Sequence, residues 1–180
     1  MKHLRKAIVL LFVVAGATAF AQSDSEKIKG LMSDADSAKT SLLAADPNLE
    51  DFFDNSAGYA LFPNVGKGGL IIGGASGNGI VYEDGMAIGK AGLKKLNVGL
   101  QAGGQSIIEV IFFETTEDLE KFKEGDFEFG AEVSAVAVKS GIAANAKYKD
   151  GVAVFALPKA GLMASASVGG QKFSYDEFDK

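Results

Sequence analysis

Residues 57–79, AGYALFPNVGKGGLIIGGASGNG, constrain the fold of this chain more than any other stretch. An apolar and aromatic run ends there at Pro63, and two glycine clusters then enclose the apolar triplet at 70–72. Pro63 fixes its own φ and disfavours a helical conformation at Phe62, so we expect the chain to turn at this point. Glycines on both sides of an apolar segment permit positive φ and close backbone approach. The stretch therefore predicts either a tightly packed corner of a sheet or a loop that faces a ligand.

The first 21 residues have the pattern of a secretory signal peptide. Lys2, Arg5 and Lys6 precede an apolar core at residues 7–17, and Ala-Phe-Ala at 19–21 is typical of a cleavage site. The core is too short for a membrane-spanning helix, and no cysteine follows it that would carry a lipoprotein anchor. An uncleaved anchor is the alternative. We expect an exported protein, periplasmic or extracellular and peripheral to any membrane it meets, with one domain at residues 22–180.

The composition of residues 22–180 narrows the possible chemistry. They contain no histidine, cysteine or tryptophan, since the one histidine of the chain is His3. This excludes Ser-His and Cys-His nucleophilic catalysis and metal sites built from His or Cys. The net charge of −5 becomes −8 once the three cations of the leader are removed, which argues against nucleic-acid binding. We therefore expect a protein that is not an enzyme and has neither a cofactor nor a metal site.

Two helices are predicted at the start of the domain. Ser23 and Glu26 have the S-x-x-E spacing of a capping box. The apolar stripe that follows at three- and four-residue steps consists of Ile28, Leu31, Met32, Ala35, Ala38 and Leu42. Asp46 is expected to cap a second helix and Pro47 to begin it, with Leu49, Phe52 and Phe53 buried. Three lysines against five acidic residues between 22 and 46 favour packing of the first helix on the domain over membrane binding.

The remainder is typical of short antiparallel strands with one inserted helix. The predicted strands are 79–82, 96–102, 105–114, 127–137, 145–149, 152–157 and 162–168. Apolar residues on both faces of 105–114 indicate a central strand covered on both sides. Turns are expected at Asp84-Gly85 and Asp150-Gly151. Thr116 is expected to cap the inserted helix at 117–123, and Gly125 to end it.

Together these elements predict an α+β fold. Its mainly antiparallel sheet should be strongly curved or barrel-like, because the strand faces are rich in glycine and alanine. The N-terminal helices and the one inserted short helix are expected to pack against it. The last predicted strand is 162–168, and the tail after it is polar and acidic apart from Phe173, Tyr175 and Phe178.

Glycine abundance does not predict a nucleotide site. Residues 85–90, GMAIGK, are one residue short of the P-loop spacing, and Ala91 stands where Ser or Thr would bind Mg²⁺. The clusters around Gly66 and Gly77 do not complete G-x-G-x-x-G. Backbone geometry explains most of these glycines.

Lysines supply the candidate binding residues. Lys67 is surrounded by Gly66, Gly68 and Gly69, so a glycine-rich loop could present its ammonium to a phosphate headgroup. A solvated lysine that keeps such a turn soluble is the alternative.

Lys90, Lys94 and Lys95 form a second cationic cluster, which is either part of a binding site or simply a solvated strand edge or helix face. Glu109 and Glu114 share an apolar strand, where paired carboxylates could perform acid–base chemistry. A glutamate that lies beside a lysine is the commoner situation. A hydrolase that works with carboxylates alone is therefore kept as a third hypothesis.

Four stretches together resemble the SYLF-domain lipid-binding family: GYALFPNVGKGGLIIGGASGNGIVY, VGLQAGGQSIIEVIFF, FEFGAEVSAVAV and KAGLMASASVGGQKFSY. The resemblance extends over nearly all of residues 22–180, and the four stretches follow one another in the expected order. The resemblance implies a non-enzymatic, membrane-associating domain with a barrel-like sheet and packed helices. Eukaryotic members bind phosphoinositides, and some connect to actin. This chain has an acidic N-terminal helix and no SH3 or FYVE module, so actin binding is not expected of it.

We therefore predict an exported protein that binds a phospholipid or docks on a bilayer. The glycine loop with Lys67 would meet the headgroup, and Tyr59, Leu61 and Phe62 would offer apolar contact. The alternative is a structural role in the cell envelope or as a small outer-membrane barrel, although the predicted strands are shorter than the ~9–11 residues of such barrels. The sequence assigns no oligomeric state.

Overall fold

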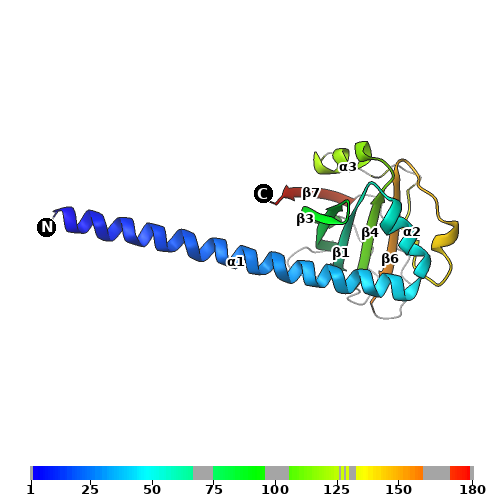
Figure 1. The fold of residues 1–180 in the computed structure, drawn as a ribbon, viewed down its shortest axis with the longest axis horizontal. Coiled ribbons are helices and arrows are strands. Elements are labelled where there is room, and N and C mark those ends of the chain that lie inside the picture. The colour runs from blue at the N-terminus through cyan, green and yellow to red at the C-terminus, as the bar shows by residue number, and fades with distance from the viewer. Residues whose placement is uncertain are drawn as a thin grey trace.

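In a computed structural model of the chain, helices lie against both faces of one curled sheet (Figure 1). The structure describes residues 2–66, 75–95, 106–125, 127, 129, 133–159 and 171–178. The helices within these ranges are α1 Lys2–Ala45, η1 Pro47–Leu49, α2 Glu50–Asn55, α3 Thr116–Lys123 and η2 Ala143–Asn145, where η marks 3₁₀ turns. The strands are β1 Gly58–Gly66, β2 Ala75–Glu83, β3 Met86–Lys95, β4 Ser106–Phe113, β5 Val136–Ala137, β6 Val152–Pro158 and β7 Gln171–Glu177.

The seven strands form one sheet in the order β5-β6-β4-β1-β2-β3-β7. Every neighbouring pair is antiparallel except β5 and β6, which are parallel. This confirms the predicted α+β class with a mainly antiparallel sheet. It also confirms β4 as a central strand, because β4 lies between β1 and β6 and its residues 108–113 are all buried.

The sheet curls so that its two ends approach each other without closing a barrel. β7 ends the sheet on one side and lies four strands from β4 in the pairing order. Even so, Gln171 Nε2 on β7 donates a hydrogen bond of 3.1 Å to Glu109 Oε2 on β4. The rings of Phe62 on β1 and Phe173 on β7 are 6.0 Å apart between centroids. The predicted strong curvature is therefore present.

Pro63 lies inside β1, where it interrupts the strand pairing and does not reverse the chain. The pairing of β1 with β4 shifts register between Phe62 and Val65. Because proline has no N–H to donate, a bulge is the usual way for a sheet to accept it. The prediction that the chain turns at Pro63 was thus wrong, and the strand continues to Gly66.

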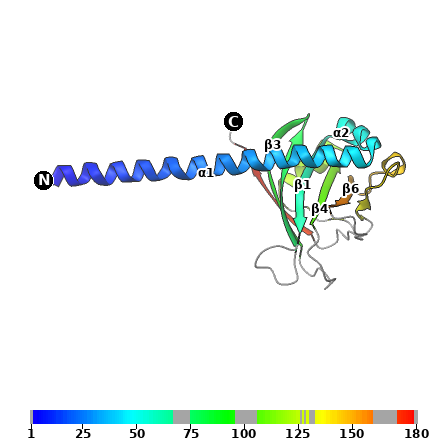
Figure 2. The same cartoon turned by 90° about the horizontal axis from the view of Figure 1, so that it is seen from below.

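Each face of the sheet has its own apolar layer. On one face, α1, η1 and α2 pack against Tyr59 and Leu61 of β1 and their neighbours, and Figure 2 shows α1 crossing that face. On the other face, α3 packs against Ala60 and Phe62 of the same strand. Successive side chains of a strand point to opposite faces, so one apolar strand supplies both layers.

The helix predictions hold with two corrections. Asp46 caps η1 by accepting a hydrogen bond from the Asn48 backbone N–H, and Pro47 follows it, as predicted. Ser23 lies within α1 and does not begin it, because the alanine-rich residues before it are strong helix formers. The cap of α3 is Thr115, one residue earlier than predicted, and its hydroxyl accepts from the Asp118 N–H.

Two predicted strands were wrong, and other strands were not predicted. Among the described residues of the predicted strand 127–137, only 136–137 form a strand, and Phe127 and Phe129 pack their rings on Phe173. Residues 145–149 do not form a strand: Asn145 ends a 3₁₀ turn, and Lys149 forms an isolated bridge with Val152. Conversely, β1, β3 and β7 were not among the predicted strands. The predicted strands 96–102 and 162–168 lie outside the described residues.

Candidate functional site

A groove with a volume of about 570 Å³ lies between α1 and the β1-β2-β3-β7 part of the sheet. Leu31 and Asp34 of α1 lie on one side of it, with Pro63 at the β1 bulge among the other lining residues. The polar groups on the strands are Asn64, Ser76, Asn78, Lys90, Lys94, Ser174 and Asp176. We call this feature the α1 groove.

Strand register explains why these polar side chains share one face. Ile80 on β2, which packs in the layer beneath α1, pairs with Lys90 on β3. Because side chains alternate along a strand, Lys94 points to the same face as Lys90. Across the next ladder, Lys90 pairs with Asp176 and Lys94 with Lys172. The face under α1 is thus apolar at Ile80 and polar further along β3.

Lys94 and Lys172 are two cations placed directly opposite each other across the β3–β7 ladder. Like charges in this arrangement repel and destabilise the pair of strands. Within the part of the chain that the structure describes, no carboxylate lies within 4.0 Å of either ammonium. An anion bound between them would remove the repulsion.

Lys90 is partly neutralised by Asp176. Its Nζ lies 3.5 Å from Asp176 Oδ2, but the two side chains are 41% and 70% exposed. Ion pairs this exposed contribute little to stability, about 0–1 kcal/mol. An anionic ligand can therefore compete with Asp176 for Lys90 at small cost.

Small and neutral groups complete the floor of the groove. Gly92 faces Ser174, and a Cβ at Gly92 would lie 2.6 Å from Ser174 Oγ, so the glycine leaves room for this hydroxyl. Asn64 Oδ1 accepts hydrogen bonds from Lys159 Nζ at 2.6 Å and from Ser106 Oγ at 3.0 Å. The groove thus combines ammonium, hydroxyl and amide groups, all of which can donate to an oxyanion.

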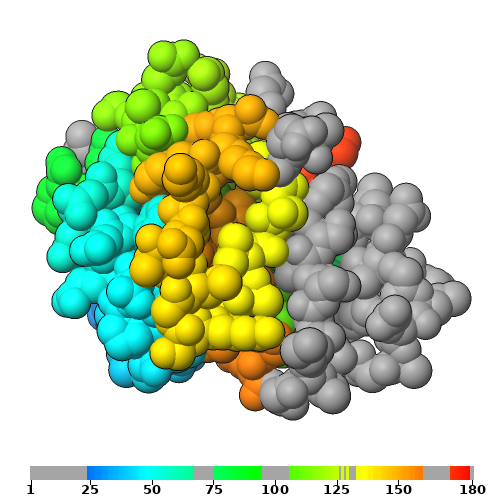
Figure 3. Space-filling view, turned by 90° about the vertical axis from the view of Figure 1, so that its right-hand side faces the viewer, coloured from blue at the N-terminus to red at the C-terminus, as the bar shows by residue number. Residues whose placement is uncertain are grey.

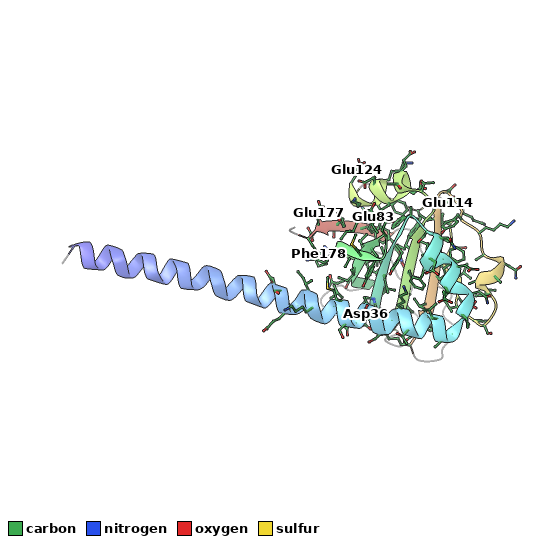
Figure 4. The ribbon with its side chains drawn as sticks, viewed as in Figure 1. Asp36, Glu83, Glu114, Glu124, Glu177 and Phe178 are labelled. Carbon is green, nitrogen blue, oxygen red and sulfur yellow. The ribbon has the colours of Figure 1, made fainter. Side chains whose placement is uncertain are left out.

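The C-terminal end of β7, near Tyr175, is surrounded by acidic residues. Burial raises the pKa of Tyr175, and Glu177 and Glu83 add to this effect while Lys123 opposes it. Figure 4 shows Glu83 and Glu177 together at this end of the sheet. An anion is therefore favoured at the end of the groove that Lys94 lines, where Lys172 is the residue paired with Lys94 on β7.

The structure brings together some of the predicted site residues and leaves others elsewhere. Lys90 and Lys94 both line the α1 groove. Gly66 ends β1, paired with Ser76 and Ser106, and Lys95 ends β3 opposite Gln171. The remaining predicted residues of the glycine loop, Lys67, Gly68 and Gly69, lie outside the described residues.

The three predicted apolar contact residues are core residues in this conformation. Tyr59, Leu61 and Phe62 are 5%, 1% and 0% exposed. Tyr59 stacks on Tyr82 with 4.7 Å between ring centroids. Burial raises the pKa of Tyr59, and its neighbours Tyr82 and Asp36 raise it further. Figure 4 labels Asp36 on α1 below the sheet.

Sequence reasoning missed the residues that β7 contributes to the groove. Ser174 and Asp176 face Gly92 and Lys90 only because β7 pairs with β3. The available signal was the period-two alternation of Phe173 and Tyr175 with polar residues.

The two carboxylates considered for acid–base chemistry are far apart. Glu109 is buried and Glu114 is exposed. Five residues along an extended chain separate them by roughly 17 Å. Within the described residues, no group of three or more His, Cys, Asp or Glu side chains is arranged to hold a metal ion. In the same part of the chain, no helix is both long and apolar enough to cross a bilayer.

Comparison with known proteins adds two similarities. Residues 94–178, which include Lys94 and all of β4 to β7, match the family model described as "Ysc84: Las17-binding protein actin regulator". The chain is also 31% identical over 146 residues to Beta cell expansion factor A of Aeromonas veronii. That alignment covers 79% of this chain and 55% of the relative, so the chain spans about half the length of that protein.

Proposed function

This chain belongs to the SYLF-domain (Ysc84) family, and from that premise we propose that it binds the phosphate of a phospholipid headgroup in the α1 groove. Family membership supports a lipid-binding type of domain. The observation that carries the more specific proposal is the pair Lys94 and Lys172, opposite each other and not neutralised by any described carboxylate within 4.0 Å.

The lining of the groove suits a phosphate oxyanion. Lysine ammonium groups are compact point charges that bind phosphate well, and hydrogen bonds between ions are stronger than those between neutral groups. Ser174 and Ser76 add hydroxyl donors on the same face. At the edge of the groove, Leu31 and Pro63 are apolar and could contact the part of a lipid next to its headgroup.

We also propose that the protein is exported after removal of residues 1–21. This rests on the sequence pattern of a positive region, a short apolar core and a small-residue cleavage site. In the periplasm or outside the cell, its ligand would be a membrane surface or a lipid released from one.

Vesicle co-sedimentation tests the headgroup site. The purified protein should bind vesicles of phosphatidylglycerol more tightly than vesicles of phosphatidylcholine. Lys94→Glu should weaken binding about tenfold or more, because a hydrogen bond to a charged group contributes about 1.5–3 kcal/mol. The matched control is Lys139→Glu, an exposed lysine in a loop away from the groove.

Two outcomes would count against the proposal. Failure of the wild-type protein to bind any lipid would remove the lipid-binding function itself. Equal losses in Lys94→Glu and Lys139→Glu would show that only total charge matters, and the α1 groove would then not be the site.

A further inference from the structure

A second pocket, with a volume of about 340 Å³, opens at the other edge of the sheet beside β6. Within the described part of the chain, β5 is two residues long and pairs only with Phe155 and Ala156 of β6. On the edge of β6 that faces away from β4, no strand of the described residues pairs with Val152 or Val154. Figure 3 shows this face, with the surface hollowed between the segment coloured yellow and the segment coloured orange. We call this feature the β6 pocket.

The interior of the β6 pocket is apolar. Its floor is formed by residues 152–155 of β6, all at most 5% exposed, and Val133 and Val136 lie beside them. Side chains from both faces of β6 reach the pocket because it opens at the edge of the strand. A ligand that fills it must therefore place apolar groups against β6.

The polar groups of the pocket are neutral or positive. Lys147 and Lys149 line it together with Ser134 and Asn145, and no acidic residue is among the lining residues. Among the described residues, neither lysine has a carboxylate within salt-bridge distance. Since both ammonium groups are exposed, they are available to an anion at the mouth.

Alternate residues of β6 turn their backbone polar groups to the same edge of the sheet. Val152 and Lys149 exchange two backbone hydrogen bonds, and the Ala156 carbonyl accepts from the Val138 N–H, so residues 152 and 156 turn their polar groups to this edge. The antiparallel ladder alternates, so the polar groups of Val154 point the same way.

We infer that the β6 pocket binds a free medium-chain carboxylate, with its carboxylate between Lys147 and Lys149 and its alkyl chain against β6. At roughly 30 Å³ per methylene-sized group, the share of a water molecule in the liquid, the pocket holds about ten such groups. An inorganic anion would leave the apolar floor without contact, and a neutral alkane would leave the two ammonium groups without a partner. The inference does not depend on the α1 groove, which lies at the β3–β7 side of the sheet.

Isothermal titration calorimetry of the purified full chain with decanoate tests this inference. Saturable binding is expected, and decyltrimethylammonium, which has the same chain length and the opposite charge, should bind at least about tenfold more weakly. The double variant Lys147→Ala/Lys149→Ala should weaken decanoate binding about tenfold. Ser134→Trp, a change at an exposed position on the pocket wall, should block it. Circular dichroism melting checks that each variant folds.

The groove variant Lys94→Ala/Lys172→Ala is the matched control, since it removes the same charge and should keep decanoate binding unchanged. It should lose binding to phosphatidylglycerol vesicles, which the two β6-pocket variants should keep. The inference is overturned if decanoate does not bind saturably, if the cationic amphiphile binds equally well, or if Lys147→Ala/Lys149→Ala binds decanoate as the wild type does.

Discussion

Asp46 joins two segments that are distant in the sequence. Its carboxylate is fully buried, and Oδ1 accepts hydrogen bonds from the backbone N–H and the side-chain amide of Asn48. Oδ2 accepts from the Ala143 N–H at 2.8 Å. Burial by itself would raise the pKa of Asp46, but these bonds and one from the Gly141 backbone outweigh it and lower the pKa from 3.8 to about 2.

This lowered pKa predicts acid sensitivity. A carboxyl group whose pKa is lower in the folded state stabilises it above the unfolded pKa of 3.8, and that stability is lost as the pH falls toward about 2. The contribution is about 2 kcal/mol. Asp46→Asn should therefore lower the free energy of unfolding by about 2 kcal/mol near neutral pH and flatten its decline below about pH 4. Urea unfolding at several pH values measures both effects.

The control for this change is Asp51→Asn, at an exposed position on α2. It should alter the free energy of unfolding by less than about 0.5 kcal/mol. If Asp46→Asn kept the full acid sensitivity of the wild type, another group would have to be responsible for it.

Asp34 opposes anion binding in the α1 groove. It is the acidic residue that α1 contributes to the lining. An exposed carboxylate this close to a bound phosphate should cost a few tenths to about 1 kcal/mol, because solvent and salt screen it. Asp34→Asn should therefore increase affinity for phosphatidylglycerol vesicles about two- to fivefold, measured by co-sedimentation. The exposed Asp51→Asn serves as the charge-matched control, and an equal gain in both variants would disprove a local effect.

Single residues were predictable from the sequence where local chemistry decides their conformation. Asp46-Pro47 begins a 3₁₀ turn, and Asp84-Gly85 and Asp150-Gly151 adopt positive φ in tight turns. Groove residues were predictable only in part. Lys90 and Lys94 stood out as cations, but nothing local places Lys172 opposite Lys94, because that pairing depends on how distant strands meet.

At the scale of elements, the contact between α1 and the sheet includes a lysine. Lys39 Nζ lies 4.4 Å from the ring centroid of Phe53 and 5.6 Å from that of Tyr59. Methionine at position 39 would keep an apolar stem but lose the charge, so Lys39→Met should cost about 0.5–1 kcal/mol. Lys39→Ala should cost more, because the stem also packs.

Chemical unfolding of the two Lys39 variants measures these costs. Lys29→Ala, at an exposed position of α1, is the control and should have almost no effect. If Lys39→Ala and Lys29→Ala behaved alike, the contact of α1 with these rings would contribute nothing to stability.

The element predictions also show what alternation can and cannot specify. Residues 105–114 alternate between two apolar sets and form a central strand, as predicted. Apolar and polar residues alternate in 127–137 as well. Phe127 and Phe129, however, pack their rings against Phe173 and do not belong to a strand of the sheet. An alternating pattern arises when every second side chain is buried, whether or not the backbone pairs with another strand. The pattern alone therefore does not show that a segment belongs to a sheet.

At the scale of the whole molecule, the curvature of the sheet depends on contacts between strands that are distant in the sequence, and a local sequence pattern does not predict such contacts. Gly79 packs so closely on β1 that an added Cβ would lie 2.6 Å from the Leu61 carbonyl oxygen. Small residues at such positions predicted a curved sheet. The hydrogen bond between Gln171 on β7 and Glu109 on β4 could not be predicted, since β7 was not recognised as a strand.

The length of α1 leads to a prediction for the whole molecule. Its N-terminal part extends away from the sheet (Figure 1). Among residues 24–45 of the helix, the buried apolar side chains are those of Ala35, Ala38 and Leu42. Removal of residues 1–21 should therefore leave the packing of α1 intact. The free energy of unfolding of a chain that begins at Gln22 should lie within about 0.5 kcal/mol of that of the full chain.

Removal of the leader should also change the role of Ser23. In the full chain Ser23 lies within α1, where a serine cap has no function. In a chain that begins at Gln22, Ser23 and Glu26 stand in the first turn and can form the capping box. Ser23→Ala should then cost about 0.5–1 kcal/mol in the shortened chain and nothing in the full chain. Mass spectrometry of the exported product identifies its first residue, and urea unfolding compares the four proteins. An exported product that keeps residues 1–21 would contradict the proposed processing. An equal loss of stability from Ser23→Ala in the full and the shortened chain would contradict the proposed cap.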